Sequence, residues 1–128
     1  MKEAAYYEKL DGNKVRCHLC PKNCVIADGK VGFCRVRRNT GGTLYSGIYA
    51  QVTSYGLDPI EKKPLYHFYP GRLISSFGTR GCNLACTFCQ NYSISQDADA
   101  PAEHITPEAA VKIAKRDRSF AIAYTYTE

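Results

Sequence analysis

Two short apolar runs, with an amphipathic stretch between them, dominate the second half of the chain. Residues 73–78 and 120–126 are almost continuously apolar, which is typical of buried strands. Thr106-Pro107-Glu108 predicts a helix start, with threonine as the N-cap and proline at the first helical position. The predicted helix has an apolar face and a basic face, formed by Ala109, Ala110, Ile113 and Ala114 and by Lys112, Lys115 and Arg116. Strand, crossover helix and strand make a βαβ unit, so we expect a parallel sheet covered on both faces.

The first half of the chain has a weaker pattern. Residues 43–56 are rich in β-branched and aromatic residues and predict one strand or paired strands, preceded by a turn at Gly41-Gly42. Residues 57–72 contain several prolines and predict a long ordered loop. Residues 3–10 predict a short amphipathic helix that ends at Asp11-Gly12.

These patterns place the chain in the α/β class, with two regions. Residues 1–72 form a cysteine-rich metal-binding and β region, in which residues 14–40 are a knuckle held by something other than a hydrophobic core. Residues 73–128 form the first βαβ unit of a barrel-like core. A two-stranded parallel sheet cannot be a finished domain, and a complete barrel takes about 200 residues or more. We therefore expect a truncated barrel.

Composition excludes some classes of protein. No run approaches the ~18 apolar residues of a membrane span, and the N-terminus lacks the apolar segment of a signal peptide. We therefore expect a cytoplasmic protein that does not insert into a membrane. The net charge is +5, but the basic residues are scattered, which argues against a nucleic-acid partner. Seven cysteines in a reducing compartment indicate metal or redox chemistry rather than disulfides.

One cysteine group has an open set of ligands. Cys82, Cys86 and Cys89 have the spacing C-x3-C-x2-C and lie just after the first apolar strand. Three thiolates can hold three irons of a [4Fe–4S] cluster, which leaves the fourth iron without a protein ligand. A zinc site normally takes four ligands, and no further Cys or His lies close by in the sequence. These residues therefore predict a catalytic iron–sulfur site.

A second cysteine group is closed. Cys17, Cys20, Cys24 and Cys34 supply four thiolates, enough for a tetrahedral zinc or a fully ligated auxiliary [4Fe–4S] cluster. The spacing fits both equally well. With no open position, a role in structure or electron relay is favoured over catalysis. His18 could replace one ligand, but its place between two cysteines favours an outward orientation.

The cysteine motif resembles that of the radical S-adenosylmethionine (SAM) superfamily. Residues 81–91, Gly-Cys-Asn-Leu-x-Cys-x-Phe-Cys-x-Asn, are most similar to the pyruvate formate-lyase activating enzyme branch. Other segments resemble the radical SAM enzymes of the AmmeMemoRadiSam system, so that the likeness covers nearly the whole chain. These segments are Arg16–Cys24, Gly32–Arg37, Asp58–Phe68 and Tyr124–Glu128.

The resemblance implies a partial TIM barrel and an oxidoreductase mechanism. The unique iron of the cluster chelates SAM, and one electron cleaves it to methionine and a 5′-deoxyadenosyl radical that abstracts hydrogen from a substrate. Cluster potentials reach down to about −700 mV, and cleavage of SAM needs this reducing end of the range. A low-potential electron donor of the flavodoxin or ferredoxin type is therefore implied. The substrate is unknown. The likeness to the activating enzymes makes a protein substrate one hypothesis, by analogy with the glycyl-radical activation that those enzymes perform.

The resemblance also suggests two cofactor-binding residues. Glu128 occupies the place of the Gly-Gly-Glu motif that binds the SAM amino group in the activating enzymes, although the two glycines are absent here. Phe88 would pack beside adenine or the cluster, with a place in the hydrophobic core as the equal alternative. Glu61-Lys62-Lys63 and His67 would either contact substrate or SAM or form a solvated charged loop.

Two other functions compete with the radical SAM hypothesis. A small iron–sulfur electron carrier would use both cysteine groups but would not need the βαβ unit. A basic zinc-binding module would predict a fourth ligand near Cys89 and a concentrated basic surface, and the sequence has neither.

Overall fold

The computed structural model describes residues 1–127, so the prediction for Glu128 lies outside the described residues. The chain forms two compact units. Unit 1 contains residues 1–49, 80–100 and Thr127, and unit 2 contains residues 50–79 and 101–126. These two units do not coincide with the predicted regions, residues 1–72 and 73–128. The division into those two regions stays a prediction.

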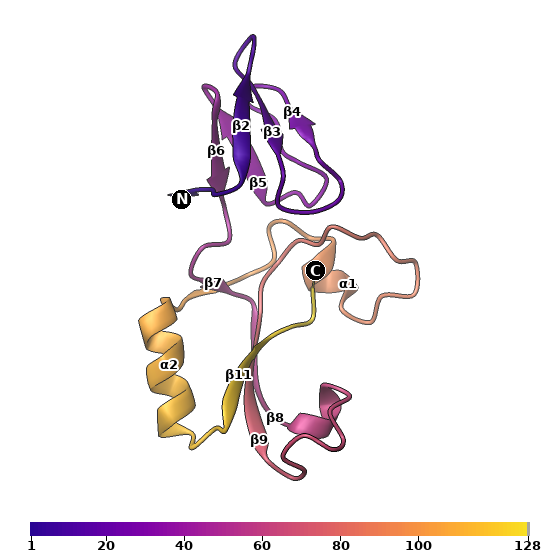
Figure 1. Cartoon of the computed structure of the whole chain (residues 1–128), viewed down its shortest axis with the longest axis vertical. Helices are drawn as coiled ribbons and strands as arrows, with labels where there is room; N and C mark the ends of the chain where they lie inside the picture. The colour runs from indigo at the N-terminus through magenta and orange to yellow at the C-terminus, as the bar shows by residue number, and fades with distance from the viewer. Residues whose placement is uncertain (128) are drawn as a thin grey trace. The chain divides into compact units, whose positions relative to one another are not determined.

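Unit 1 is built from two small antiparallel sheets (Figure 1). One sheet has the order β1-β6-β5 and the other has the order β2-β3-β4. The first consists of β1 (Lys2–Glu3), β6 (Thr43–Ser46) and β5 (Arg37–Thr40), and the second of β2 (Tyr7–Leu10), β3 (Lys14–Cys17) and β4 (Val25–Ile26). The turn predicted at Gly41-Gly42 is confirmed. It joins β5 to β6, and both glycines have positive φ, +60° and +78°, as a two-residue hairpin turn requires.

The helix predicted for residues 3–10 is wrong, because the segment contains the end of β1 and all of β2. Tyr6 lies between the two strands with a φ of +57°, which no α-helix accommodates. β2 pairs with β3, with Tyr7 opposite Cys17. A segment this short has little helical stability of its own, so pairing with a distant strand decides its conformation.

Unit 1 also has a hydrophobic core, contrary to the prediction for residues 14–40. Val15 and Ile26 are 0% and 2% exposed, and they pack with Ala4, Cys17 and Leu44. The core is small, and Cys17 belongs to it. The knuckle is therefore held in part by apolar packing.

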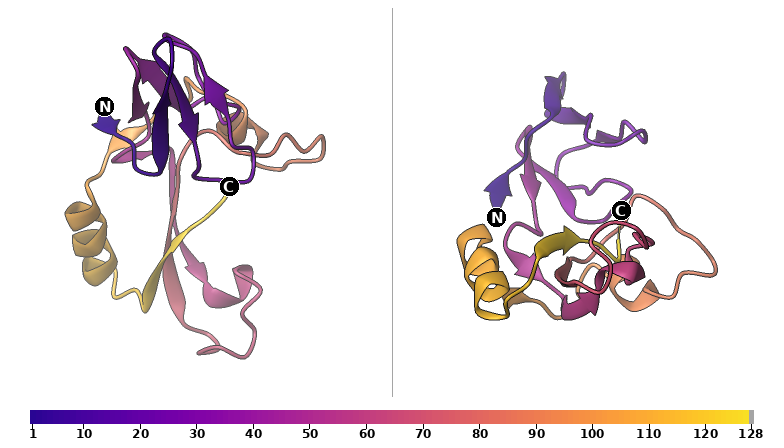
Figure 2. Two further views of the ribbon diagram at one scale, coloured as in Figure 1. Left: turned by 45° about the horizontal axis from the view of Figure 1, so that its top comes forward. Right: turned by 60° about the horizontal axis from the view of Figure 1, so that its bottom comes forward.

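Unit 2 contains the predicted βαβ unit. Its main sheet has the order β11-β9-β8, in which β11 (Ala121–Tyr124) is parallel to β9 (Leu73–Gly78) and β8 (Ser54–Pro59) is antiparallel to it. The crossover helix α2 (Pro107–Arg116) lies beside β11 (Figure 2). The βαβ unit is confirmed, whereas its continuation into a partial barrel stays a prediction.

The helix signals in the sequence are confirmed in detail. The Oγ1 of Thr106 accepts a hydrogen bond from the Ala109 N–H at 3.2 Å, and Pro107 is the first helical residue. Ala110 and Ala114 are buried, and the three basic residues of the opposite face are exposed. The remaining elements are short. They are β7 (Gln51–Val52), which pairs with β10 (Glu103–His104), the 3-10 helix η1 (Ile60–Lys62), and α1 (Tyr92–Ser95) of unit 1.

The strands predicted at residues 43–56 are confirmed as β6, β7 and the start of β8. β8 extends to Pro59, further than expected, and η1 follows it, so that the predicted loop begins only after Lys62.

A buried carboxylate ties the start of this loop to the sheet of unit 2. Asp58 accepts hydrogen bonds from Lys62 Nζ at 2.8 Å, Lys63 Nζ at 3.0 Å and the Tyr126 hydroxyl at 3.0 Å. The hydrogen bond from Lys62, assisted by that from Lys63, holds the pKa of the Asp58 carboxyl well below its usual range despite the opposing effect of burial.

We expect Asp58→Asn to lower the free energy of unfolding at pH 7 by about 1–3 kcal/mol, because the ammonium of Lys63 loses its charged partner. The folded pKa of Asp58 is depressed, so its contribution is fully present above the unfolded pKa of about 4 and declines progressively as the pH falls from there through the lower folded pKa. Urea unfolding at pH 7 and at pH 3 should therefore show the difference from wild type shrinking. The exposed Asp11→Asn is the control, and a difference independent of pH would contradict the assignment.

Candidate metal centre

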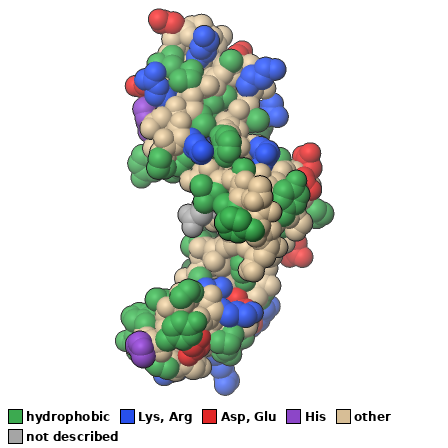
Figure 3. Space-filling model, turned by 90° about the vertical axis from the view of Figure 1, so that its right-hand side faces the viewer, with side chains coloured by type: hydrophobic (Ala, Val, Ile, Leu, Met, Phe, Trp, Pro, Cys, Tyr) green, Lys and Arg blue, Asp and Glu red, His purple; other side chains and the backbone are tan. Residues whose placement is uncertain are grey.

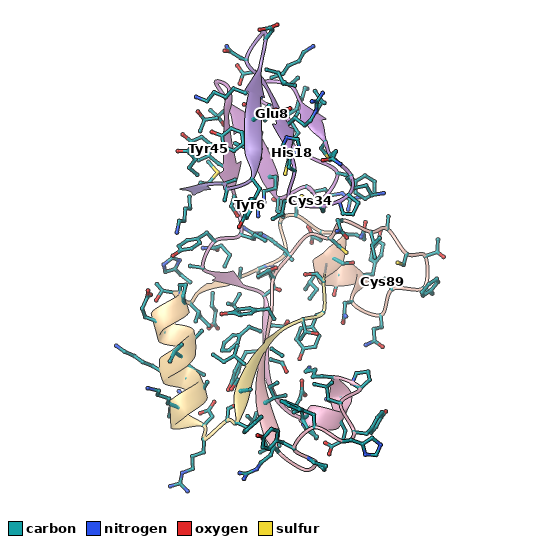
Figure 4. The ribbon with its side chains drawn as sticks, viewed as in Figure 1. Tyr6, Glu8, His18, Cys34, Tyr45 and Cys89 are labelled. Atoms are coloured by element: carbon teal, nitrogen blue, oxygen red, sulfur yellow. The ribbon has the colours of Figure 1, made fainter. Side chains whose placement is uncertain are left out.

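The three cysteines of the open group share one irregular loop of unit 1, which follows β9 in the chain. Cys82 is 7% exposed, and Cys86 and Cys89 are half-buried (Cys89 is labelled in Figure 4). The Cys89 N–H donates to the Cys86 carbonyl at 3.3 Å, which closes a turn between the last two cysteines. All seven cysteines are free of disulfide bonds.

Polar groups already surround two of these sulfur atoms. The Leu84 N–H donates to Cys82 Sγ at 3.4 Å, and the Sγ of Cys89 lies 3.5 Å from the Ser95 hydroxyl oxygen. Hydrogen bonds to sulfur are among the features that tune the potential of an iron–sulfur cluster. The donor types therefore suit a thiolate-ligated cluster.

The sulfur atoms do not converge in the described structure. Within residues 1–127, no three His, Cys, Asp or Glu side chains form a group that could hold a metal ion. Cluster binding would thus require the loop to draw Cys82, Cys86 and Cys89 together. The loop has little regular structure to oppose this, since its only helix is the single turn of α1.

Asn83 offers a further polar atom next to Cys82. Its Oδ1 is buried and has no hydrogen-bond partner within residues 1–127. Leaving a buried acceptor unsatisfied costs about 1–3 kcal/mol, so a water molecule or a ligand group that donates a hydrogen bond would stabilise this position. A cationic amino group or a hydroxyl group of a ligand would satisfy it.

Gln96 fixes the loop from the other side of α1. Its Nε2 donates to the Leu84 carbonyl at 2.9 Å, and its Oε1 accepts from Arg35 Nη1 at 2.6 Å. Arg35 directly follows Cys34. The side chain of Gln96 therefore links the loop of Cys82 to the segment that carries Cys34, the last cysteine of the closed group. The sequence carried no local signal for Gln96, because its partners are distant in the chain.

Gly81 provides a second link between the same two segments. A Cβ at this position would lie 2.6 Å from the Cys34 carbonyl oxygen and 2.6 Å from Val36 Cγ1, and the φ of Gly81 is +80°. Only glycine therefore permits the close backbone approach that places Cys82 next to the Cys34 segment. The Gly81 N–H also donates to the Ile94 carbonyl at 2.9 Å.

The closed group lies at one end of the β2-β3-β4 sheet. Cys17 ends β3 and is buried, Cys24 precedes β4, and Cys20 lies in the loop between them. His18 is not directed at the cysteines. Its Nδ1 lies 3.2 Å from Asn23 Oδ1 and its Nε2 lies 3.5 Å from Glu8 Oε1, which agrees with the predicted outward orientation (Figure 4).

Phe88 is not part of a hydrophobic core. Its side chain is 87% exposed, so the core alternative is wrong, while its contact with a cofactor stays a prediction. Glu128, the other suggested SAM-binding residue, lies outside the described residues.

The charged loop of unit 2 is largely exposed, but three of its charged side chains are held by specific contacts. Lys62 and Lys63 both pair with Asp58, and Glu61 Oε1 accepts a hydrogen bond from the Gly71 N–H at 2.7 Å. That N–H lowers the pKa of Glu61. His67 is exposed. The two lysines therefore have a structural role, and contact with substrate stays a prediction for all four residues.

Basic residues form no continuous patch on the face shown in Figure 3, where Lys and Arg side chains alternate with hydrophobic and polar ones. The net charge of +5 is spread in the same way along the chain. This distribution gives no support to the nucleic-acid alternative.

Comparisons with known proteins found a similar sequence that covers the whole chain. The chain is 51% identical over 130 residues to the uncharacterized protein MJ0808 of Methanocaldococcus jannaschii, and the match covers 100% of this chain and 39% of that protein. The chain thus spans well under half the length of the relative it matches. No protein-family model and no solved structure matches the chain. Among residues 1–127, no helix is both long and apolar enough to cross a membrane.

The close approach at Gly81 can be tested by substitution. We expect Gly81→Ala to detach the loop from the Cys34 segment, because the methyl group would meet backbone at 2.6 Å in addition to the cost of a positive φ. Labelling of the buried Cys82 thiol by iodoacetamide, followed by mass spectrometry, should become at least several-fold faster.

Gly29→Ala is the matched control. Gly29 belongs to the same unit and has a similar φ of +72°, but a Cβ there would meet no atom within 4 Å. Equal labelling rates in the two variants would mean that the close approach does not protect Cys82.

Proposed function

We propose that Cys82, Cys86 and Cys89 bind a [4Fe–4S] cluster and that this chain carries the SAM-cleaving site of a radical SAM enzyme. The observation that carries the proposal is the position of the loop. The loop follows β9. This strand pairs in parallel with β11, and the crossover helix α2 lies between the two strands in the sequence. In α/β barrels, catalytic residues lie on the loops after the carboxyl ends of parallel strands.

The number of ligands supports a catalytic rather than a purely structural cluster. Three thiolates leave one iron of a cubane without a protein ligand, and an open coordination position is where a substrate can bind. When bound, such a cluster supplies an electron and an open iron site for reductive cleavage of SAM to methionine and a 5′-deoxyadenosyl radical.

Backbone and side-chain groups of the loop would support the cluster and bind SAM. The Leu84 N–H stabilises negative charge on Cys82, and the Ser95 hydroxyl group is close enough to do the same for Cys89. The buried Oδ1 of Asn83 would accept a hydrogen bond from an N–H of the SAM amino group. The exposed ring of Phe88 offers a face on which adenine can stack.

The proposal implies partners beyond this chain. Reduction of the cluster needs a low-potential donor of the flavodoxin or ferredoxin type, and a reducing cytoplasm would keep the seven thiols available for metals. The substrate that loses hydrogen is not specified by residues 1–127. A protein substrate, as in glycyl-radical activation, is the hypothesis that the activating-enzyme resemblance favours.

The first test is anaerobic reconstitution of the chain with iron and sulfide. We expect wild type to bind about four iron and four sulfide in the open group, as its cubane requires, and the Cys82/Cys86/Cys89→Ala triple variant to lose them. The EPR signal of dithionite-reduced wild type should change when SAM is added. His18→Ala is the control, because His18 contacts Asn23 and Glu8 and belongs to neither proposed ligand set, so the variant should keep the SAM-sensitive signal. Zinc without sulfide in wild type, or an unchanged cluster in the triple variant, would refute the proposal.

Phe88 provides a separate test of cofactor binding. Because the ring is exposed, we expect Phe88→Ala to change the free energy of unfolding by less than about 0.5 kcal/mol. The loss of one stacking contact, about 0.5–1.5 kcal/mol, should weaken SAM binding to the reconstituted chain about two- to ten-fold in an EPR titration. Tyr6→Ala, a 71% exposed aromatic of the same unit, is the control. An unchanged SAM affinity in Phe88→Ala would remove Phe88 from the site.

A further inference from the structure

The closed cysteine group contains a cross-strand pair. In the ladder of β3 and β4, Val15 lies opposite Ile26 and Arg16 lies opposite Val25. The same register places Cys17 opposite Cys24, and the Cys17 N–H donates to the Cys24 carbonyl at 2.9 Å. Side chains of directly opposed residues lie on one face with Cβ atoms about 4.5–5.5 Å apart. Both cysteines also contact the same core of Val15, Ile26 and Leu44.

The other two cysteines are brought toward this pair by separate contacts. Cys20 lies in the loop that joins Cys17 to Cys24, and its carbonyl accepts from the Asn23 N–H at 3.2 Å. Cys34 follows Gly32, where a Cβ would lie 3.8 Å from Cys24 Sγ. The chain then turns, because the Arg35 N–H donates to the Gly32 carbonyl at 2.8 Å.

A cation–π contact joins the two loops directly. Lys22 Nζ lies 4.3 Å from the centroid of the Phe33 ring. Lys22 belongs to the loop of Cys20, and Phe33 is the neighbour of Cys34. Four thiolates on one Zn²⁺ carry a net charge of −2, and this ammonium is placed to offset part of it.

We propose that Cys17, Cys20, Cys24 and Cys34 bind a single structural zinc ion. The cross-strand pair suits zinc, because two thiolates on one zinc at Zn–S ≈ 2.3 Å in tetrahedral geometry lie about 4 Å apart, a separation that the side chains of an opposed pair can reach. Within residues 1–127 the four sulfur atoms are not yet converged, so binding draws the two loops toward the pair while β3 and β4 keep their register.

The zinc site would also support the loop of Cys82. It would fix the segment of Cys34, whose carbonyl oxygen limits the space at Gly81 and whose neighbour Arg35 holds Gln96. Loss of zinc should therefore make the loop of Cys82 less well ordered, as well as the segments that carry the closed group. This inference does not depend on the proposed SAM chemistry.

The test uses the Cys82/Cys86/Cys89→Ala triple variant of the full chain, which keeps all four proposed ligands. Purified from zinc-supplemented medium, it should contain about one zinc per chain by elemental analysis and no acid-labile sulfide. Replacement of the metal by Co²⁺ should give the intense d–d and sulfur-to-metal charge-transfer bands of tetrahedral tetrathiolate coordination. In this background, Cys24→Ser should lose the bound zinc, and His18→Ala should retain it because His18 faces Asn23 and Glu8.

Other outcomes overturn the inference. Iron and sulfide retained by the triple variant after anaerobic reconstitution, in preference to zinc, would make the closed group an auxiliary cluster. Seven alkylated cysteines and no zinc in the wild-type chain would leave it without a metal. Zinc content is measured separately from the iron of the open group, so this result stands whether or not that group binds a SAM-sensitive cluster. If Cys24→Ser does not fold, the cobalt spectrum of the triple variant still decides the ligand set.

Discussion

The close approach of Gly81 to the Cys34 carbonyl is the constraint on which the candidate site depends. It brings together two segments that are far apart in the chain, and each carries a cysteine next to the point of contact. The hydrogen bond from Arg35 to Gln96 reinforces the same junction. Both contacts lie within unit 1, so the loop of Cys82 is held by the N-terminal cysteine-rich segment as well as by its own chain neighbours.

The two cysteine groups have different structural support, in line with the different roles that we propose for them. Cys17 and Cys24 extend a paired β-ladder and touch a hydrophobic core, so the closed group is anchored by regular structure. Cys82, Cys86 and Cys89 lie on an irregular loop with few internal backbone hydrogen bonds. An anchored, fully ligated site suits a structural ion, whereas an adaptable three-thiolate loop suits a cluster that must also accept a small-molecule ligand.

Electrostatics reinforce this arrangement within each unit. In unit 2, Asp58 binds two lysines and the Tyr126 hydroxyl, which turns a charged loop into an anchored one. In unit 1, the Leu84 N–H donates to Cys82 Sγ, and the ammonium of Lys22 lies over the ring of Phe33, the neighbour of Cys34. Net charge alone indicated none of this, because the effects come from individual pairs at short range.

Local sequence determined the elements whose signals are local. The N-cap at Thr106, the apolar runs of β9 and β11, the Gly41-Gly42 turn and the grouping of the cysteines all follow from neighbouring residues, and the βαβ unit was predicted on that basis. Only the tertiary structure decided that residues 3–10 become strands, that Gln96 bridges two segments, and that Asp58 captures Lys62 and Lys63. The physical reason is that these outcomes depend on partners far away in sequence, whose pairing outweighs the weak conformational preferences of short segments.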